Sequence, residues 1–142
     1  MQHIMVATDG SEGADRAVDF AAHMAKAMGG RLTILTVEGN LSSDELRQLA
    51  RAESDLGDVL QSLSNGILVR ARERVEGIAD VPCKRQTAWG DTAEAIVTAV
   101  RDEHVDAVVI GRRGRGRLAG LLLGSVSQKV ASLAPCIVVV VP

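Results

Sequence analysis

The chain has 142 residues, of which 46% are hydrophobic and 24% are charged, values typical of one globular domain and not of a disordered chain. Its formal net charge of −2 argues against a surface built to bind nucleic acid. Two cysteines, Cys83 and Cys136, without a Cys-x-x-Cys or Cys/His spacing, exclude a disulfide framework and a zinc site.

The amino-terminal sequence MQHIMVATDGSE lacks the basic start, long apolar stretch and cleavage site of a signal peptide. The longest apolar run, residues 136–141, is much shorter than the roughly 20 residues of a membrane-spanning helix. With no sign of disulfides, we therefore expect a cytoplasmic protein with no membrane partner.

The first predicted elements are a strand, a helix and a second strand. Residues 3–7 (HIMVA) and 31–37 (RLTILTV) are short apolar runs rich in β-branched side chains, as in strands covered on both faces. Between them, Ser11 is expected to cap a helix whose apolar residues recur at helical spacing up to Gly29-Gly30.

A long helix is predicted in the middle of the chain. Residues 38–55 have weak periodicity and are expected to be the most mobile part, although Ser42-x-x-Glu45 resembles a capping box for a short helix. The helical phase then continues straight through Asn65-Gly66, a pair that otherwise signals a turn, over Leu56, Leu60, Leu63, Ile67, Ala71, Val75 and Ile78.

The last third of the chain repeats the alternation. A weak strand is predicted at residues 81–88 and an apolar one at 105–110, separated by a helix that begins at Asp91-x-x-Glu94. Ser125 is expected as the N-cap of the last helix, ahead of a final strand at residues 136–141. The alternation of strands and helices, without an internal repeat or linker, predicts one α/β domain over residues 1–142, with a parallel sheet covered by helices on both faces.

The loop 111–125 (GRRGRGRLAGLLLGS) is the strongest functional signal. Glycines adopt positive φ angles and allow consecutive N–H groups to converge on an anion. Gly124-Ser125 then opens a helix whose N–H groups favour phosphate, and Ser125 and Ser127 add hydroxyl donors. Positive charge is supplied by Arg112, Arg113, Arg115 and Arg117.

A second candidate segment, residues 7–11, leaves the first strand. Ligands of such sheets bind beyond the carboxyl ends of the strands, where the strand order reverses. If the first and fourth strands are neighbours, Asp9 and Gly111 face one crevice. Because Asp9 would repel a phosphate, it is expected at the other end of a nucleotide, accepting hydrogen bonds from ribose or base, or holding Mg²⁺.

Two familiar phosphate-binding fingerprints are absent. The chain has no GxxxxGK[ST] sequence, and Gly114-x-Gly116-x-x-x-Gly120 misses the dinucleotide spacing by one residue and follows the fourth strand, not the first. Instead, Gly111-x2-Gly114-x9-Gly124-Ser125 resembles the G-2x-G-9x-G(S/T) pattern of the ATP-binding branch of the universal stress protein family. Residues 5–21, 88–100 and 105–142 resemble the family's opening, middle and ending.

The resemblance implies a Rossmann-like fold of the adenine nucleotide alpha hydrolase type, with five strands in the order 3-2-1-4-5 and ATP, with or without Mg²⁺, between strands one and four. It places Thr8, Asp9 and Val37 on the adenine and ribose side. Ile110 and Gly111 are expected to close over the adenosine. The resemblance assigns ribose and phosphates to Arg112, Gly114, Gly124, Ser125, Val126 and Ser127.

The implied function is that of a nucleotide-dependent regulatory or stress-response switch with an unidentified protein partner. No general base is placed beside the phosphates, so we expect slow ATP hydrolysis at most. Two alternatives stay open: an ATPase or phosphotransferase in which Asp9 and magnesium direct a water or hydroxyl, and a nucleotide-free partner-binding module.

Several residues outside the loop also carry expectations. The apolar run 136–141 would form an edge strand without lysine, proline or charge, which predicts a homodimer through strand pairing. Trp89 is expected either near the crevice or over the sheet edge. The histidines lack metal-ligand spacing, Cys83 and Cys136 are expected to be buried, and the arginines lack the aromatic platforms of an RNA site.

Overall fold

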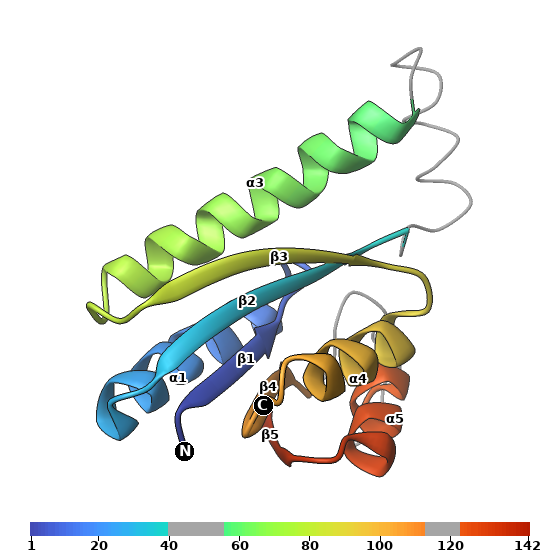
Figure 1. Ribbon diagram of the computed structural model, residues 1–142. Coiled ribbons are helices and arrows are strands. Elements are labelled where there is room, and N and C mark those ends of the chain that lie inside the picture. The colour runs from blue at the N-terminus through green and yellow to red at the C-terminus, as the bar shows by residue number, and fades with distance from the viewer. Residues whose placement is uncertain (40–55, 113–122) are drawn as a thin grey trace.

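A computed structural model describes residues 1–39, 56–112 and 123–142. Its strands and helices alternate along the chain (Figure 1). They are β1 (His3–Ala7), α1 (Glu12–Met28), β2 (Arg31–Glu38), α3 (Leu56–Glu76), β3 (Cys83–Trp89), α4 (Thr92–Asp102), β4 (Ala107–Gly111), α5 (Ser125–Leu133) and β5 (Ile137–Val141). The five strands are parallel and lie in the order β3-β2-β1-β4-β5, which confirms the predicted topology.

Helices cover both faces of the sheet, and each face has its own apolar core. Alternate residues of β1 point to opposite faces. Ile4 and Val6 pack with α1 and α3, while Met5 packs with α4 and α5. All three side chains are fully buried, which explains why the strand is apolar at successive positions and not at every second one.

Helix α1 has the ends that its sequence predicts. The Ser11 hydroxyl oxygen accepts a hydrogen bond from the Ala14 amide at 3.3 Å, and Gly29 ends the helix with a φ of 64°. The buried side of α1 is mostly alanine, with Ala17, Ala21 and Ala25 fully buried. These small side chains allow the helix axis to lie close to the sheet, so α1 sets the position of the turn that precedes it.

Helix α3 runs without a break through Asn65-Gly66, as the helical phase predicts. Leu68, Ala71 and Val75 are buried against the sheet, and this packing outweighs the low helix propensity of the Asn-Gly pair. The helix ends at Glu76, two residues before the last apolar position of the predicted pattern.

Two expectations need correction. Gly124, not Ser125, is the N-cap of α5: Gly124 has the extended φ and ψ of −69° and 166°, and Ser125 is the first helical residue. The helix therefore has no side-chain cap, although Gln128 Nε2 donates to the Leu123 carbonyl at 3.0 Å. Cys83 and Cys136 are half-buried and not fully buried, because both lie at the amino-terminal border of edge strands.

The segment 40–55, which includes the Ser42-x-x-Glu45 pattern, lies outside the described residues. So do Gly114 and the arginines at positions 113, 115 and 117. Within the described ranges, no helix is both long and apolar enough to span a membrane.

Candidate functional site

Strands β1 and β4 are neighbours, which brings the two candidate segments to the same edge of the sheet. Ile4 pairs with Ala107 and Val6 with Val109, in parallel register. The chain therefore leaves β1 at Thr8 beside the point where it leaves β4 at Gly111. The strand order also reverses between these two strands, which is where open parallel sheets bind ligands.

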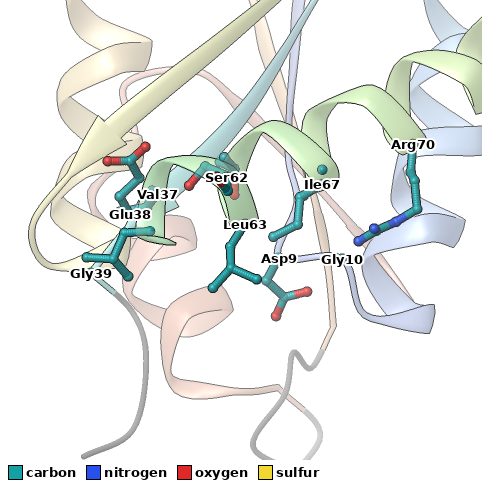
Figure 2. Close-up of a pocket in the computed structure, with 13 residues that line it drawn as sticks. Asp9, Gly10, Val37, Glu38, Gly39, Ser62, Leu63, Ile67 and Arg70 are labelled. Atoms are coloured by element: carbon teal, nitrogen blue, oxygen red, sulfur yellow. The ribbon is translucent and has the colours of Figure 1, made fainter. Parts of the chain in front are cut away.

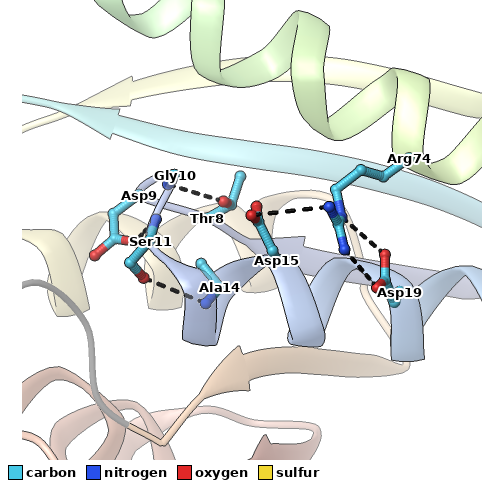
Figure 3. Close-up of polar contacts among 8 residues, drawn as sticks. All are labelled: Thr8, Asp9, Gly10, Ser11, Ala14, Asp15, Asp19 and Arg74. Atoms are coloured by element: carbon cyan, nitrogen blue, oxygen red, sulfur yellow. Dashed lines mark hydrogen bonds and ion pairs between the residues drawn. The ribbon is translucent and has the colours of Figure 1, made fainter.

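The turn after β1 is held by short hydrogen bonds within itself (Figure 3). The Thr8 hydroxyl oxygen accepts from the Gly10 amide at 3.1 Å, and Asp9 Oδ1 accepts from the Ser11 amide at 2.9 Å. Gly10 has a φ of 81°, a conformation that favours glycine. Asp9 Oδ2 has no hydrogen-bond partner among the described residues, so one oxygen of this fixed carboxylate is free to accept from a ligand.

The end of β4 lies directly against the start of α1. A Cβ built on Gly111 would lie 3.1 Å from the Gly13 carbonyl oxygen and 3.2 Å from its carbonyl carbon. Both contacts are with backbone atoms, which cannot move aside easily. A side chain at position 111 would therefore require the Gly13 backbone to shift by a few tenths of an ångström, so this close packing favours glycine whether or not a ligand is bound.

Ser127 ties the end of β4 to the start of α5. Its buried hydroxyl donates to the carbonyl oxygens of Gly111 at 2.7 Å and Arg112 at 3.0 Å. The Gly124 amide also donates to the Arg112 carbonyl, at 2.8 Å. These bonds bring four of the predicted site residues together: Gly111, Arg112, Gly124 and Ser127.

Arg112 joins this cluster to the last strand. Its amide donates to the Val141 carbonyl oxygen at 2.7 Å. Its Nε atom is buried and has no hydrogen-bond partner in the described part of the chain. A buried donor without a partner is costly, so an acceptor supplied by a ligand would fit here.

Ile110 and Val126 have a different relation to the site. Ile110 is 3% exposed and lies in the core between the sheet and α4. Val126 is half-buried and packs against the same cluster. Any contact of Ile110 with a ligand therefore has to come from its backbone, while its side chain contributes to the core.

A pocket opens on the other side of β1, between α3 and the carboxyl ends of β1 and β2 (Figure 2). Its volume is about 240 Å³. Asp9 and Val37, predicted from the sequence to lie on the same side of a ligand, both line it. We call this the α3 pocket; its helical wall consists of Leu60, Ser62, Leu63, Ser64, Gly66, Ile67 and Arg70.

Sequence reasoning missed the α3 wall. Gly66 could have indicated this wall, because it is a glycine in the interior of a long helix and it lines the pocket. A residue that is unfavourable for its own secondary-structure element, such as a glycine in a helix interior, is often associated with a functional site.

Trp89 lies near the pocket and also at the sheet edge. It ends the edge strand β3, pairs in register with Glu38, and is 66% exposed. A Cβ built on Gly39 would lie 3.5 Å from Trp89 Cζ2, and Gly39 lines the α3 pocket. The indole therefore lies at the sheet edge and next to Gly39 of the pocket wall.

The other titratable candidates have structural environments. Burial, followed by the charge of Arg31, lowers the pKa of His3, whose Nε2 lies 2.8 Å from Thr33 Oγ1. Burial raises the pKa of the Cys83 and Cys136 thiols, which keeps them protonated and poorly nucleophilic. No group of three His, Cys, Asp or Glu side chains within the described ranges could hold a metal ion.

Comparison with known proteins shows the family of the chain. The model of the universal stress protein family matches residues 1–142. The chain belongs to this family. A universal stress protein of Thermus aquaticus is 34% identical over 97% of this chain and 96% of its own length. The universal stress protein YxiE of Bacillus subtilis is 31% identical, with 97% of each chain covered.

A solved structure of a universal stress protein in complex with cAMP is also similar to the chain. Its sequence is 29% identical, and the two structures superpose with a TM-score of 0.78 over 99% of this chain and 97% of that one. The likeness therefore extends over the whole fold, including the edge formed by β1 and β4.

Proposed function

We propose that this universal stress protein binds an adenine nucleotide, ATP in particular, and acts as a nucleotide-dependent regulatory switch in a stress response. The observation that carries the proposal is the meeting of the Thr8–Asp9 turn and the Gly111–Arg112 strand end at one edge of the sheet. The related structure in complex with cAMP supports an adenine nucleotide as the ligand class.

The two sides of β1 suit different parts of the nucleotide. Asp9 and Val37 line the α3 pocket, where a carboxylate oxygen and an apolar side chain can meet ribose and base. Arg112, Gly124 and Ser125 lie on the β4 side, where the start of α5 presents its first N–H groups and the positive end of a helix dipole. Phosphates are therefore expected on the β4 side, together with Gly114, which lies outside the described residues.

If Mg²⁺ accompanies ATP, Asp9 would be the carboxylate that holds the ion, as an alternative to accepting hydrogen bonds from ribose or base. The described residues around the β4 edge include no carboxylate or imidazole that we assign as a general base. We therefore propose a binding protein with slow hydrolysis at most, and not an efficient ATPase.

The same proposal places the protein in the cytoplasm as a homodimer that responds to an unidentified protein partner. Strand β5 is the edge of the sheet and has only Ile and Val side chains. Ile137 is 53% exposed. An apolar edge strand without a charged residue is suited to pair with a second copy.

Isothermal titration calorimetry with ATP tests the proposal. The wild type should bind ATP, and the double variant Gly114→Val/Gly124→Val should not, because the valine side chains would occupy the space next to the phosphates. Gly124 has a negative φ, so valine at 124 does not strain the backbone conformation.

Asp9→Asn is a second variant that keeps an oxygen acceptor for the Ser11 amide and removes the charge. It should weaken ATP binding while leaving the thermal midpoint nearly unchanged. Trp89 emission gives an independent readout, because Trp89 is the only tryptophan in the chain. Equal ATP binding by the wild type and both variants would show that the site is assigned wrongly.

A further inference from the structure

Three arginines on α3 differ in what they contact. Arg72 Nε donates to Glu76 at 3.1 Å, and its Nη1 donates to the Cys83 carbonyl at 2.9 Å. Arg74 donates to both carboxylate oxygens of Asp19, at 2.9 and 2.7 Å (Figure 3). Arg70 makes no hydrogen bond or ion pair with any described residue, and it is the one of the three that lines the α3 pocket.

The guanidinium of Arg70 lies next to two glycines. A Cβ built on Gly10, in the turn after β1, would lie 3.5 Å from Arg70 Nη2, and one built on Gly66 would lie 3.6 Å from Arg70 Nη1. Figure 2 shows the side chain extending from α3 toward Gly10. The guanidinium is thus placed over the turn that carries Asp9.

The position of the Arg70 guanidinium offers a reason for glycine at position 66. Glycine lowers the stability of a helix interior, and Gly66 is in the middle of α3. The absence of a side chain at 66 leaves open space beside Arg70, one helical turn further along the same face. A side chain larger than alanine at 66 would compete with the guanidinium for this space.

The charges around the pocket indicate which part of a ligand Arg70 can meet. Asp9 and Glu38 also line the α3 pocket, so a phosphate placed there would face two carboxylates. The apolar wall formed by Leu63 and Ile67 suits a flat ring instead. A guanidinium can donate hydrogen bonds to ring or sugar acceptors and can stack on a planar ring.

We propose that Arg70 is a ligand-contacting residue that binds the nucleoside part of the nucleotide in the α3 pocket. This inference rests on the proposed function, because the nucleotide is the ligand that Arg70 would contact. It assigns base and ribose to the α3 side of β1 and leaves the phosphates to the β4 side. The pocket volume of about 240 Å³ lies below the roughly 300–1,000 Å³ of typical small-molecule sites, which favours a part of the nucleotide as its occupant.

The test measures the affinities of adenosine, AMP and ATP by calorimetry for the wild type, Arg70→Gln and Arg70→Lys. Arg70→Gln should weaken all three ligands by the same factor, about tenfold, since one charge-assisted contact to a shared part is lost. Arg70→Lys should not restore binding, because lysine lacks the planar fork. Arg101→Gln, an exposed arginine on α4, is the matched control and should bind like the wild type.

Each other result has a distinct meaning. If the loss of affinity in Arg70→Gln increases from adenosine to AMP to ATP, Arg70 contacts phosphate. If the affinities are unchanged, Arg70 contacts no part of the ligand. Either result overturns the inference. If the wild type binds none of the three, the proposed function fails and the inference fails with it. Thermal unfolding separates these results from a folding defect, because Arg70 has no partner to lose in the described structure.

Discussion

Ser127 offers a sharp test of how the β4 end is held. Its side chain is 3% exposed and its hydroxyl donates to the carbonyls of Gly111 and Arg112. Ser127→Ala removes this donor, and the Gly111 carbonyl loses the hydroxyl bond in a buried environment. The change should cost about 1.5 kcal/mol from the lost bond and desolvation. Alanine's higher helix propensity should return about 0.5 kcal/mol, which leaves a net loss of about 1 kcal/mol.

The loss can be converted into a thermal shift. An unfolding entropy of about 2.1 cal/mol/K per residue gives about 0.3 kcal/mol/K for 142 residues. The thermal midpoint of Ser127→Ala should therefore fall by about 3 °C, measured by circular dichroism or calorimetry.

Ser132→Ala is the matched control on the same helix. Ser132 is exposed, and its hydroxyl donates only to the Gln128 carbonyl one turn earlier, at 2.9 Å. Its loss should change the stability by less than about 0.5 kcal/mol, or about 1.5 °C. Equal midpoints for the two variants would refute the claim that the buried hydroxyl of Ser127 holds the end of β4.

Three further predictions concern other parts of the fold. Arg74→Ala should lower the free energy of unfolding by about 0.5–1 kcal/mol in urea titrations at low salt. The loss should be smaller at 1 M salt, because the bonds of Arg74 to Asp19 are partly exposed and salt screens them. An equal loss at both salt concentrations would contradict an ion-pair origin. Because burial lowers the pKa of His3, the unfolded chain takes up this proton first as the pH falls. Stability should therefore decline as the pH falls through the ordinary histidine pKa of about 6.5. His3→Gln should flatten this decline in urea titrations, and an unchanged slope would exclude His3 as its cause. Ile137→Lys should convert a dimer to a monomer in size-exclusion chromatography with light scattering, and a wild type that is already monomeric at micromolar concentration would rule out the proposed β5 pairing.

The fold could be predicted because its local signals agree with its packing. The limits 3–7 are those of β1, and the Ser11 and Gly29 signals mark the two ends of α1. The apolar character of successive strand residues predicted a sheet covered on both faces, and β1 packs into a core on each face. The strand order came from the family resemblance, since hydrophobic periodicity carries no information about which strands are neighbours.

The details of the site depend on distances that the sequence does not encode. Serine is a good capping residue, which predicts Ser125 as the N-cap, but the extended backbone conformation occurs one residue earlier, at Gly124. The exposure of Arg70 next to Gly10 depends on how α3 crosses the β1 turn, a tertiary feature. The family motif predicts a binding role for Gly111, while the structure adds a steric reason for glycine in the contact with Gly13.

The proposed site and the proposed dimer edge are joined by backbone hydrogen bonds. The carbonyl of Arg112 accepts from Ser127 and Gly124, while its amide donates to the carbonyl of Val141 at the end of β5. The Arg112 amide also shares its peptide unit with the Gly111 carbonyl, which accepts from Ser127. A nucleotide that moves the start of α5 would therefore act on the peptide unit that fixes the last residue of the edge strand. A switch requires two arrangements of the protein with different nucleotide affinity. We expect these hydrogen bonds to couple a change in the position of α5 to a change in the position of the edge strand. If Ser127→Ala leaves both nucleotide affinity and oligomeric state unchanged, the connection does not carry the proposed regulation.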